Sequence, residues 1–135
     1  EPTTALDVTI QAQIFDLLKK FIEQTKSGVL FISHDLGAVS EMSDNIAVLF
    51  SGQMMEQANK KTIINMPKHP YTKYLIDSIN KFSSDKIQVL NNKYTSGCSY
   101  SHRCQYFSKE CEIVSDLITI NNNHKSSCVR NNIIK

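Results

Sequence analysis

Four cysteines near the end of the chain are the side chains best suited to chemistry. They are Cys98, Cys104, Cys111 and Cys128, with five, six and sixteen residues between successive members. Cysteine thiolates ligate soft metals, but the paired two-residue spacings of a zinc knuckle are absent. A [4Fe–4S] cluster tolerates looser spacings, because its ligands approach separate irons. The spacings leave open an iron–sulfur cluster, a zinc site with Cys or Cys/His ligands, disulfides and unliganded thiols.

His34 is a second candidate, because it follows an apolar run at residues 29–32 that itself follows Gly28. Such a run predicts a strand buried on both faces of a parallel sheet. Ligands of open α/β sheets bind at the carboxyl ends of the strands, so this imidazole is a candidate for contact with a substrate or a phosphate. The alternative is a partly buried, hydrogen-bonded structural histidine.

A helix precedes the predicted strand. Asp7 stands before an amphipathic pattern that ends in residues 25–28, where Lys26 lies near the negative end of the helix and Gly28 can adopt the left-handed conformation. The apolar stripe consists of Ile10, Ile14, Leu17, Leu18, Phe21 and Ile22. Helix followed by strand is half of a βαβ unit, so we expect a largely parallel sheet.

A short helix and a hairpin are predicted next. Asp35 can cap a helix that runs to Met42, and residues 45–50 indicate another buried strand. The pair Ser51-Gly52 is typical of a two-residue hairpin turn, after which residues 53–56 return antiparallel at the sheet edge.

One more helix is predicted from His69, with Pro70 in its first turn. Its apolar stripe consists of Tyr71, Leu75, Ile76 and Ile79. Residues 81–97 are polar and predict a linker that holds at most one short strand.

The two halves of the chain carry opposite charge. Residues 1–58 hold three lysines and eight acidic residues, whereas residues 59–135 hold twelve Lys and Arg and five acidic residues. This change of sign predicts a domain boundary near Asn59. No apolar run is long enough to span a bilayer, and no signal peptide is recognisable. We therefore expect a protein that is soluble, or peripheral to a membrane through a partner. The chain begins with Glu1 rather than Met, which leads us to expect a piece of a longer protein.

Two segments in order resemble the ATP-binding subunits of ABC transporters. They are residues 1–7, Glu-Pro-Thr-Thr-Ala-Leu-Asp, and residues 32–36, Ile-Ser-His-Asp-Leu. The resemblance implies a carboxylate that polarises the attacking water, a D-loop against a second ATPase subunit, and a histidine on the γ-phosphate of ATP bound with Mg²⁺. These roles fall to Glu1, to Ala5, Leu6 and Asp7, and to His34, respectively. Hydrolysis of a phosphoanhydride requires such a carboxylate and such a donor.

The phosphate-binding loop of that family does not occur in this sequence. Its four glycines are scattered and none precedes a lysine, and the magnesium aspartate, the signature motif and the glutamine loop are also missing. Backbone amides and a lysine are needed to hold the phosphates. We therefore expect this piece alone neither to bind nor to hydrolyse ATP appreciably.

A second resemblance narrows the family. Residues 69–78, His-Pro-Tyr-Thr-Lys-Tyr-Leu-Ile-Asp-Ser, look like the C-terminal extension of oligopeptide and dipeptide importer ATPases, a group that also includes nickel importers. Ala58 stands where that group usually has Gly, and Asn80 where it usually has Pro. These changes affect the local turn geometry.

The cysteine-bearing tail is similar to the same extension. Residues 97–104 resemble its pattern G-C-x-F-x-P-R-C, with Tyr100 for Phe and His102 for Pro, and His102 adds a competing metal ligand. The resemblance implies a [4Fe–4S] cluster, with zinc as the alternative. The implied ligands are Cys98, Cys104, Cys111 and Cys128. Disulfides are disfavoured in a reducing cytosol, and a cluster would act as a structural staple for a tail of low apolar content.

The resemblance implies an α/β fold. Residues 1–58 would be the C-terminal part of a P-loop NTPase-type ABC nucleotide-binding domain, and residues 59–135 a small irregular cysteine-rich extension. The intact subunit would energise peptide uptake together with a second ATPase subunit and transmembrane permease subunits, and indirectly with a solute-binding protein. It would lie in the cytoplasm, on the inner face of the cell membrane, without a nucleic-acid partner.

Two alternatives stay open. The basic half could be a metal-binding regulatory or nucleic-acid-binding module, although its aromatic and basic residues gather around the cysteines rather than form a stacking platform. The chain could also be a non-functional remnant, an interpretation prompted by the missing phosphate-binding loop.

Overall fold

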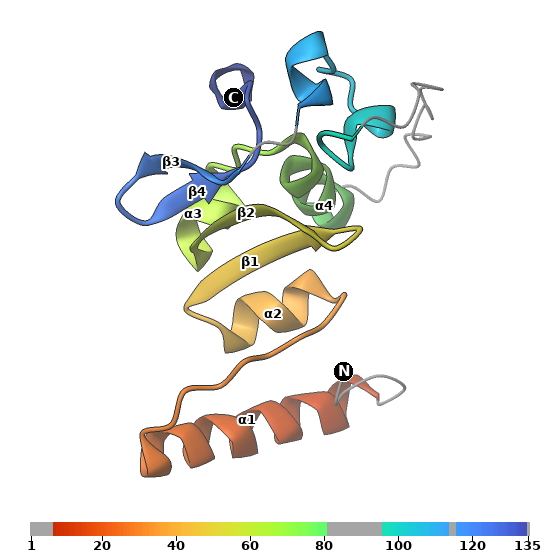
Figure 1. Ribbon diagram of the computed structural model, residues 1–135. Coiled ribbons are helices and arrows are strands. Elements are labelled where there is room, and N and C mark those ends of the chain that lie inside the picture. Colours follow the sequence, from red (N-terminus) through yellow and green to blue (C-terminus); the bar gives the residue numbers. More distant parts are fainter. Residues whose placement is uncertain (1–6, 81–95, 114–115, 135) are drawn as a thin grey trace. The chain divides into compact units, whose positions relative to one another are not determined.

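The computed structural model describes residues 7–80, 96–113 and 116–134. Two compact units make up the chain, Glu1–Asp44 and Asn45–Lys135 (Figure 1). The domain boundary predicted near residue 59 stays a prediction, and most of the linker predicted at 81–97 lies outside the described residues. Within those described ranges, no helix is long and apolar enough to cross a membrane.

Helix α1, Val8–Thr25, begins where the sequence predicts. The Asp7 side chain accepts the backbone N–H of Ile10 at 2.9 Å, which makes Asp7 the N-cap. The predicted apolar stripe is not buried as expected, since Ile10, Leu17 and Phe21 are 41%, 65% and 55% exposed. The buried side chain of the helix is instead Phe15, which is 2% exposed and whose ring meets that of Phe31 edge-on with 5.8 Å between centroids. The cap therefore formed as predicted, whereas the burial falls on Phe15 rather than on the predicted stripe.

The end of α1 differs from the prediction. The left-handed residue is Lys26, with φ 54°, and not Gly28. The backbone N–H of Lys26 donates to Ile22 O at 2.9 Å and closes the last turn before the chain reaches the glycine.

The buried strand predicted at residues 29–32 is wrong for this structure. These residues have no regular secondary structure, and the Val29, Leu30 and Ile32 side chains are 49%, 86% and 67% exposed. A strand needs a neighbouring strand for its backbone hydrogen bonds. In Glu1–Asp44, the described residues form only helices and irregular chain, so this segment has no neighbour to pair with.

Helix α2, Leu36–Met42, is capped by Asp35 as predicted. One oxygen of the Asp35 carboxylate accepts the backbone N–H groups of Gly37 at 2.8 Å and Ala38 at 3.2 Å. The short helix therefore needs only the sequence next to it to begin.

The second unit contains a four-stranded sheet in the order β1-β2-β4-β3. Its strands are β1 Asn45–Phe50, β2 Gln53–Asn59, β3 Ile118–Asn121 and β4 His124–Ser126. Every pairing is antiparallel, so the largely parallel sheet predicted from a βαβ unit is wrong for the described residues. The mixture of helices and sheet agrees with an α/β chain at the coarse level.

The β1–β2 hairpin confirms the predicted turn, but β2 lies between β1 and β4 and not at the sheet edge as predicted. Ser51 and Gly52 both have positive φ, 47° and 78°, which is the signature of a type I′ turn. Side chains of β1 alternate between exposed and buried, with Ile46 and Val48 inside, so one face of this strand is exposed rather than both buried.

Two helices pack against β2: α3, Lys60–Asn65, and α4, Pro70–Asn80 (Figure 1). The predicted start of α4 at Pro70 is confirmed. Among the described residues 96–113 and 116–134 there are three single-turn 3₁₀ helices, Ser101–Arg103, Lys109–Glu112 and Asn131–Ile133. The buried apolar residues of the hairpin and the two helices are Ile46, Val48, Met55, Ala58, Ile63 and Ile76.

Candidate metal centre at the cysteine cavity

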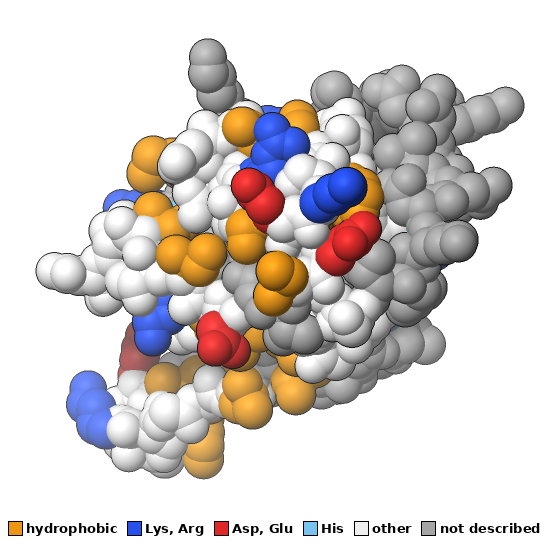
Figure 2. Space-filling model, turned by 45° about the horizontal axis from the view of Figure 1, so that its top comes forward, with side chains coloured by type: hydrophobic (Ala, Val, Ile, Leu, Met, Phe, Trp, Pro, Cys, Tyr) orange, Lys and Arg blue, Asp and Glu red, His pale blue; other side chains and the backbone are white. Residues whose placement is uncertain are grey.

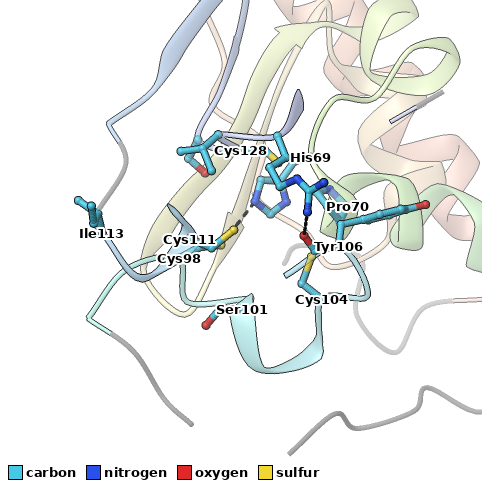
Figure 3. A pocket seen from close by; sticks show the side chains of 12 residues that line it. His69, Pro70, Cys98, Ser101, Cys104, Tyr106, Cys111, Ile113 and Cys128 are labelled. Carbon is cyan, nitrogen blue, oxygen red and sulfur yellow. Dashed lines mark hydrogen bonds between the residues drawn. The ribbon is translucent and has the colours of Figure 1, made fainter. Parts of the chain in front are cut away.

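All four cysteines line one cavity of the second unit (Figure 3). Including its open mouth, the cavity measures about 400 Å³, and the four cysteines are free thiols. They come from separate parts of the tail, namely the turn before the first 3₁₀ helix, its C-cap, the second 3₁₀ helix and the chain after β4. The fold therefore gathers around one space four thiols that are far apart in sequence.

Cys98 and Cys111 are held next to each other by a backbone crossing. The N–H of Cys98 donates to Cys111 O at 3.0 Å. At this crossing a Cβ on Gly97 would collide with the carbonyl oxygen of Cys111, so only glycine fits. Gly97 is thus the residue that permits the first and third thiols to approach.

The end of the hairpin anchors the same turn. The Oε1 atom of Gln53 accepts the backbone N–H of Ser99 at 2.9 Å, and its Nε2 donates to Gly97 O at 3.3 Å. The hydroxyl of Ser99 donates to Phe50 O at 3.1 Å. Gln53 had no assigned role in the sequence, because neither its type nor its spacing marks it before the hairpin and the tail are brought together.

Cys128 is positioned from the sheet. The Cys128 N–H donates to the Ser126 hydroxyl at 3.2 Å, and the Ser127 N–H donates to Met55 O at 2.9 Å, which ties this segment to β2. Across the cavity, Nη1 of Arg130 donates to Tyr106 O at 3.2 Å (Figure 3). Residues 127–130 are therefore hydrogen-bonded both to β2 and to the tail segment that holds Tyr106.

Burial governs the charge of the thiols. Desolvation raises the pKa of Cys98, that of Cys104 to about 11 and that of Cys128 to about 12, and the neighbouring thiols add to each shift. Without a cation these thiols stay protonated at neutral pH. A bound cation would reverse this balance, since thiolates are the metal-ligating form.

A buried carboxylate holds the base of the site together. Glu56 on β2 is 0% exposed, and its Oε1 accepts the Lys68 N–H at 2.7 Å and the Nε2 of His124 at 2.6 Å. Its Oε2 accepts the His69 N–H at 2.9 Å. Sequence analysis missed this cluster. The signal that could have found it is a glutamate at an inward-facing position of a predicted strand.

His69 links this carboxylate to the cavity. It is 1% exposed, and its C=O accepts the N–H of Lys73 at 3.0 Å, so His69 is the N-cap of α4. Its Nδ1 accepts the N–H of Tyr71 at 3.1 Å, and its Nε2 lies 3.8 Å from Cys98 Sγ (Figure 3). Burial lowers the pKa of His69 to about 4.

An aromatic cluster lies beside His69. Phe50, Tyr71 and Tyr100 meet with ring centroids 4.7 to 5.4 Å apart. His102, the competing ligand expected from sequence, has its ring 6.3 Å from that of Phe50 and is not among the cavity-lining residues, whereas His69 is. The histidine at the cavity is therefore a different one from the one predicted.

The geometry is not that of a preformed single-ion site. Across residues 7–80, 96–113 and 116–134, no group of three or more His, Cys, Asp or Glu side chains is placed to hold one metal ion. Four sulfurs at about 2.3 Å from a single zinc would require such a group. The thiols instead line a shared space.

The residues predicted to act on ATP lie in the other unit. Glu1, Ala5 and Leu6 are outside the described residues, so their predicted roles stay predictions. Asp7 caps α1, and His34 is exposed in the irregular segment before Asp35. The structure thus assigns Asp7 a local role and leaves the phosphate-contacting role of His34 untested.

Charged side chains of both signs are mixed on the face drawn in Figure 2. On the described part of the face drawn in Figure 2, Lys and Arg side chains lie beside Asp and Glu side chains rather than in a single basic patch. A backbone-tracking groove would need a run of positive charge.

Comparisons with known proteins agree with the order of the motifs. Residues 55–111 match the model of the oligopeptide/dipeptide transporter C-terminal region. The oligopeptide transport ATP-binding protein OppD of Haemophilus influenzae is 35% identical over 95% of this chain and 42% of its own length. The dipeptide transport ATP-binding protein DppD of Bacillus subtilis is 37% identical over 95% of this chain and 41% of its own. OppD of Lactococcus lactis is 51% identical over 58% of this chain. The chain spans less than half the length of these relatives.

Proposed function

Because the chain belongs with the C-terminal part of oligopeptide/dipeptide-type ABC transporter ATP-binding subunits, we propose that the protein hydrolyses ATP to drive peptide uptake through a membrane permease. The observation that carries the proposal is the similarity of 95% of the chain to peptide transport ATP-binding proteins. We place residues 1–58 in the nucleotide-binding domain and residues 59–135 in the extension.

Only a few residues of this chain are assigned a role in ATP hydrolysis. Glu1 orients the attacking water, and His34 donates to the γ-phosphate oxygens, where negative charge accumulates. Residues 5–7 contact a second ATPase subunit, so that ATP and Mg²⁺ are held between two chains. The phosphate-binding loop is supplied by the rest of the subunit, which leads us to expect no activity from these 135 residues alone.

The location and the partners follow from the same proposal. The subunit works in the cytoplasm at the inner face of the membrane, docked on permease subunits, and a solute-binding protein delivers the peptide to them. No nucleic acid takes part.

The test is peptide uptake by cells that carry the full subunit and its permease. Glu1→Gln is expected to lower uptake and ATP hydrolysis by about 10²-fold or more while ATP still binds, because a general base contributes that much. Gln13→Ala, on the exposed surface of α1, is the control and is expected to leave both unchanged. Unchanged uptake in Glu1→Gln would overturn the assignment.

For the cysteine cavity we propose a [4Fe–4S] cluster held by Cys98, Cys104, Cys111 and Cys128, with a single zinc as the alternative. The support for this is the donor set, because four free thiols from separate segments line one cavity. When bound, the cluster supplies covalent cross-links between segments of the tail. The residues themselves orient the sulfurs through Gly97, Gln53 and Ser126.

Metal analysis after anaerobic purification tests the cluster. We expect about four iron and four sulfide per chain with a broad visible absorption band, and loss of both in Cys104→Ser. Gln105→Ser, at the exposed neighbouring position, is the matched control. One zinc without colour would replace the cluster by the alternative. If the tail resists proteases equally with and without metal, the stapling role is wrong.

A further inference from the structure

His69 occupies a position that ties the start of a helix to the cysteine cavity. Its backbone is fixed at both ends, since its N–H donates to Glu56 Oε2 at 2.9 Å and its C=O accepts the Lys73 N–H at 3.0 Å. Pro70 restricts the next backbone torsion. The imidazole is 1% exposed, and its ring centroid lies 6.2 Å from that of Tyr100. The ring therefore has little freedom to turn.

The hydrogen bonds define which ring nitrogen carries the proton. The Nδ1 atom accepts the backbone N–H of Tyr71 at 3.1 Å, so Nδ1 presents a lone pair. A neutral imidazole with a bare Nδ1 has its proton on Nε2. The Nε2–H faces the sulfur of Cys98, with 3.8 Å between the two heavy atoms (Figure 3).

We propose that His69 is a positioning residue that donates its Nε2–H to the sulfur of Cys98 and stabilises negative charge on that sulfur in the metal-bound centre. This inference rests on the proposed metal centre. A hydrogen bond to a sulfur ligand favours the reduced, more negative state of the group it ligates, and so raises its reduction potential. Of the four cysteines, Cys98 is the one whose sulfur receives a hydrogen bond from the residue that caps α4.

Glu56 connects this contact to the sheet. One carboxylate binds the N–H groups of Lys68 and His69 and the ring of His124, so β2, β4 and the start of α4 meet at one buried point. Any shift of β2 against α4 would move the imidazole relative to Cys98. The inference thus gives the His-Pro-Tyr segment a chemical reason: His caps the helix and reaches the sulfur, Pro occupies the first helical position, and Tyr supplies the N–H that fixes the ring.

The test uses His69→Asn in the full chain. The Asn side-chain oxygen can still cap α4, but the side chain is too short to reach Cys98. His102→Asn is the matched control, because that imidazole does not line the cavity. The expected result is a metal centre with a more negative reduction potential and a changed visible spectrum in His69→Asn, with both unchanged in His102→Asn. An unchanged potential in a fully loaded His69→Asn protein overturns the inference.

A second measurement needs no variant at the site. The ¹⁵N NMR spectrum of histidine-labelled wild-type protein reports the tautomer of each ring, with His69 assigned by the signal absent from His69→Asn. Protonated Nε2 and bare Nδ1 support the inference, and the opposite tautomer overturns it, even if His69→Asn folds poorly. If wild-type protein holds no metal, the metal-centre proposal fails, whereas the tautomer in the metal-free protein still decides whether His69 donates to Cys98.

Discussion

Glu1–Asp44 and Asn45–Lys135 bury different kinds of side chain. In the first unit, α1 and α2 are each capped by the residue before them, and the apolar run at 29–32 stays largely exposed. In the second, Ile63 is 0% exposed, and the Glu56 side chain on β2 is buried with partners from two other segments, residues 68–69 and β4. The first unit is thus organised by neighbouring residues, whereas the second depends on contacts between residues distant in sequence.

This difference predicts that substitutions cost more free energy of unfolding in the second unit than in the first. Helix caps contribute about 1 kcal/mol each, whereas removing one partner of a buried charged cluster costs about 3–5 kcal/mol. All five tyrosines lie in the second unit, so tyrosine fluorescence follows its unfolding. Hydrogen exchange at the amides of α1 and α2 follows the first. Variants can therefore be scored in each unit separately.

The largest effect is expected from Glu56→Ala. Loss of the carboxylate leaves two backbone N–H groups and the His124 ring without their buried acceptor, so the free energy of unfolding of the second unit should fall by about 3–5 kcal/mol. Urea denaturation followed by tyrosine fluorescence measures this. Glu41→Ala is the control in the first unit, where hydrogen exchange at the α1 and α2 amides gives its effect, because its pair with Lys19 at 2.8 Å is on the surface and is expected to contribute less than about 1 kcal/mol. A similar loss of unfolding free energy in both variants would contradict the conclusion that the buried Glu56 cluster contributes more than a surface pair.

Apolar truncation is the next test. Ile63→Ala removes a fully buried side chain and should lower the free energy of unfolding by about 2–5 kcal/mol. Leu30→Ala removes a side chain that is 86% exposed and should change it by about 0.5 kcal/mol or less. Urea denaturation of the second unit and hydrogen exchange of the first give the two values. A large loss from Leu30→Ala would mean that the 29–32 segment is buried in solution.

Local signals explain which elements were predictable. Asp7, Asp35, the Ser51-Gly52 turn and Pro70 each act within a few residues, and the elements that they begin or join formed as predicted. The strand at 29–32 failed because an apolar run states a preference for burial but not what covers it. The parallel sheet failed with it, since that prediction needed a partner strand.

The site was predictable in composition but not in arrangement. Sequence singled out the four cysteines, and the fold lines one cavity with them. It could not find Glu56 or Gln53, because each acts on residues at least ten positions away in sequence. It also named His102 as a competing ligand, because His102 replaces a proline of the family pattern, whereas the imidazole beside a thiol is that of His69, placed there by the packing of α4 on β2.

Gly97 in the second unit and Gly28 in the first differ in the space around their Cα atoms. Gly97→Ala forces a methyl group into the carbonyl of Cys111 and should cost about 1–3 kcal/mol in the second unit. At Gly28 the same methyl group meets nothing within 4 Å, so Gly28→Ala should leave stability unchanged or raise it by about 0.4–1 kcal/mol. Denaturation of the Gly97→Ala and Gly28→Ala variants gives the two changes in the free energy of unfolding. Equal effects would contradict the close crossing of residues 97 and 111.

Asp7 gives the smallest expected effect and separates a local role from a functional one. Asp7→Ala removes the acceptor for the Ile10 N–H and should cost about 1 kcal/mol, seen as faster hydrogen exchange in the first turn of α1. Asp7→Asn keeps a capping oxygen but removes the charge, so α1 should be nearly as stable as in the wild type. If Asp7 also contacts a second ATPase subunit, Asp7→Asn in the full subunit should lower ATP hydrolysis while α1 stays intact. Unchanged hydrolysis would leave Asp7 as a cap alone, with its whole effect explained by the helix that follows it.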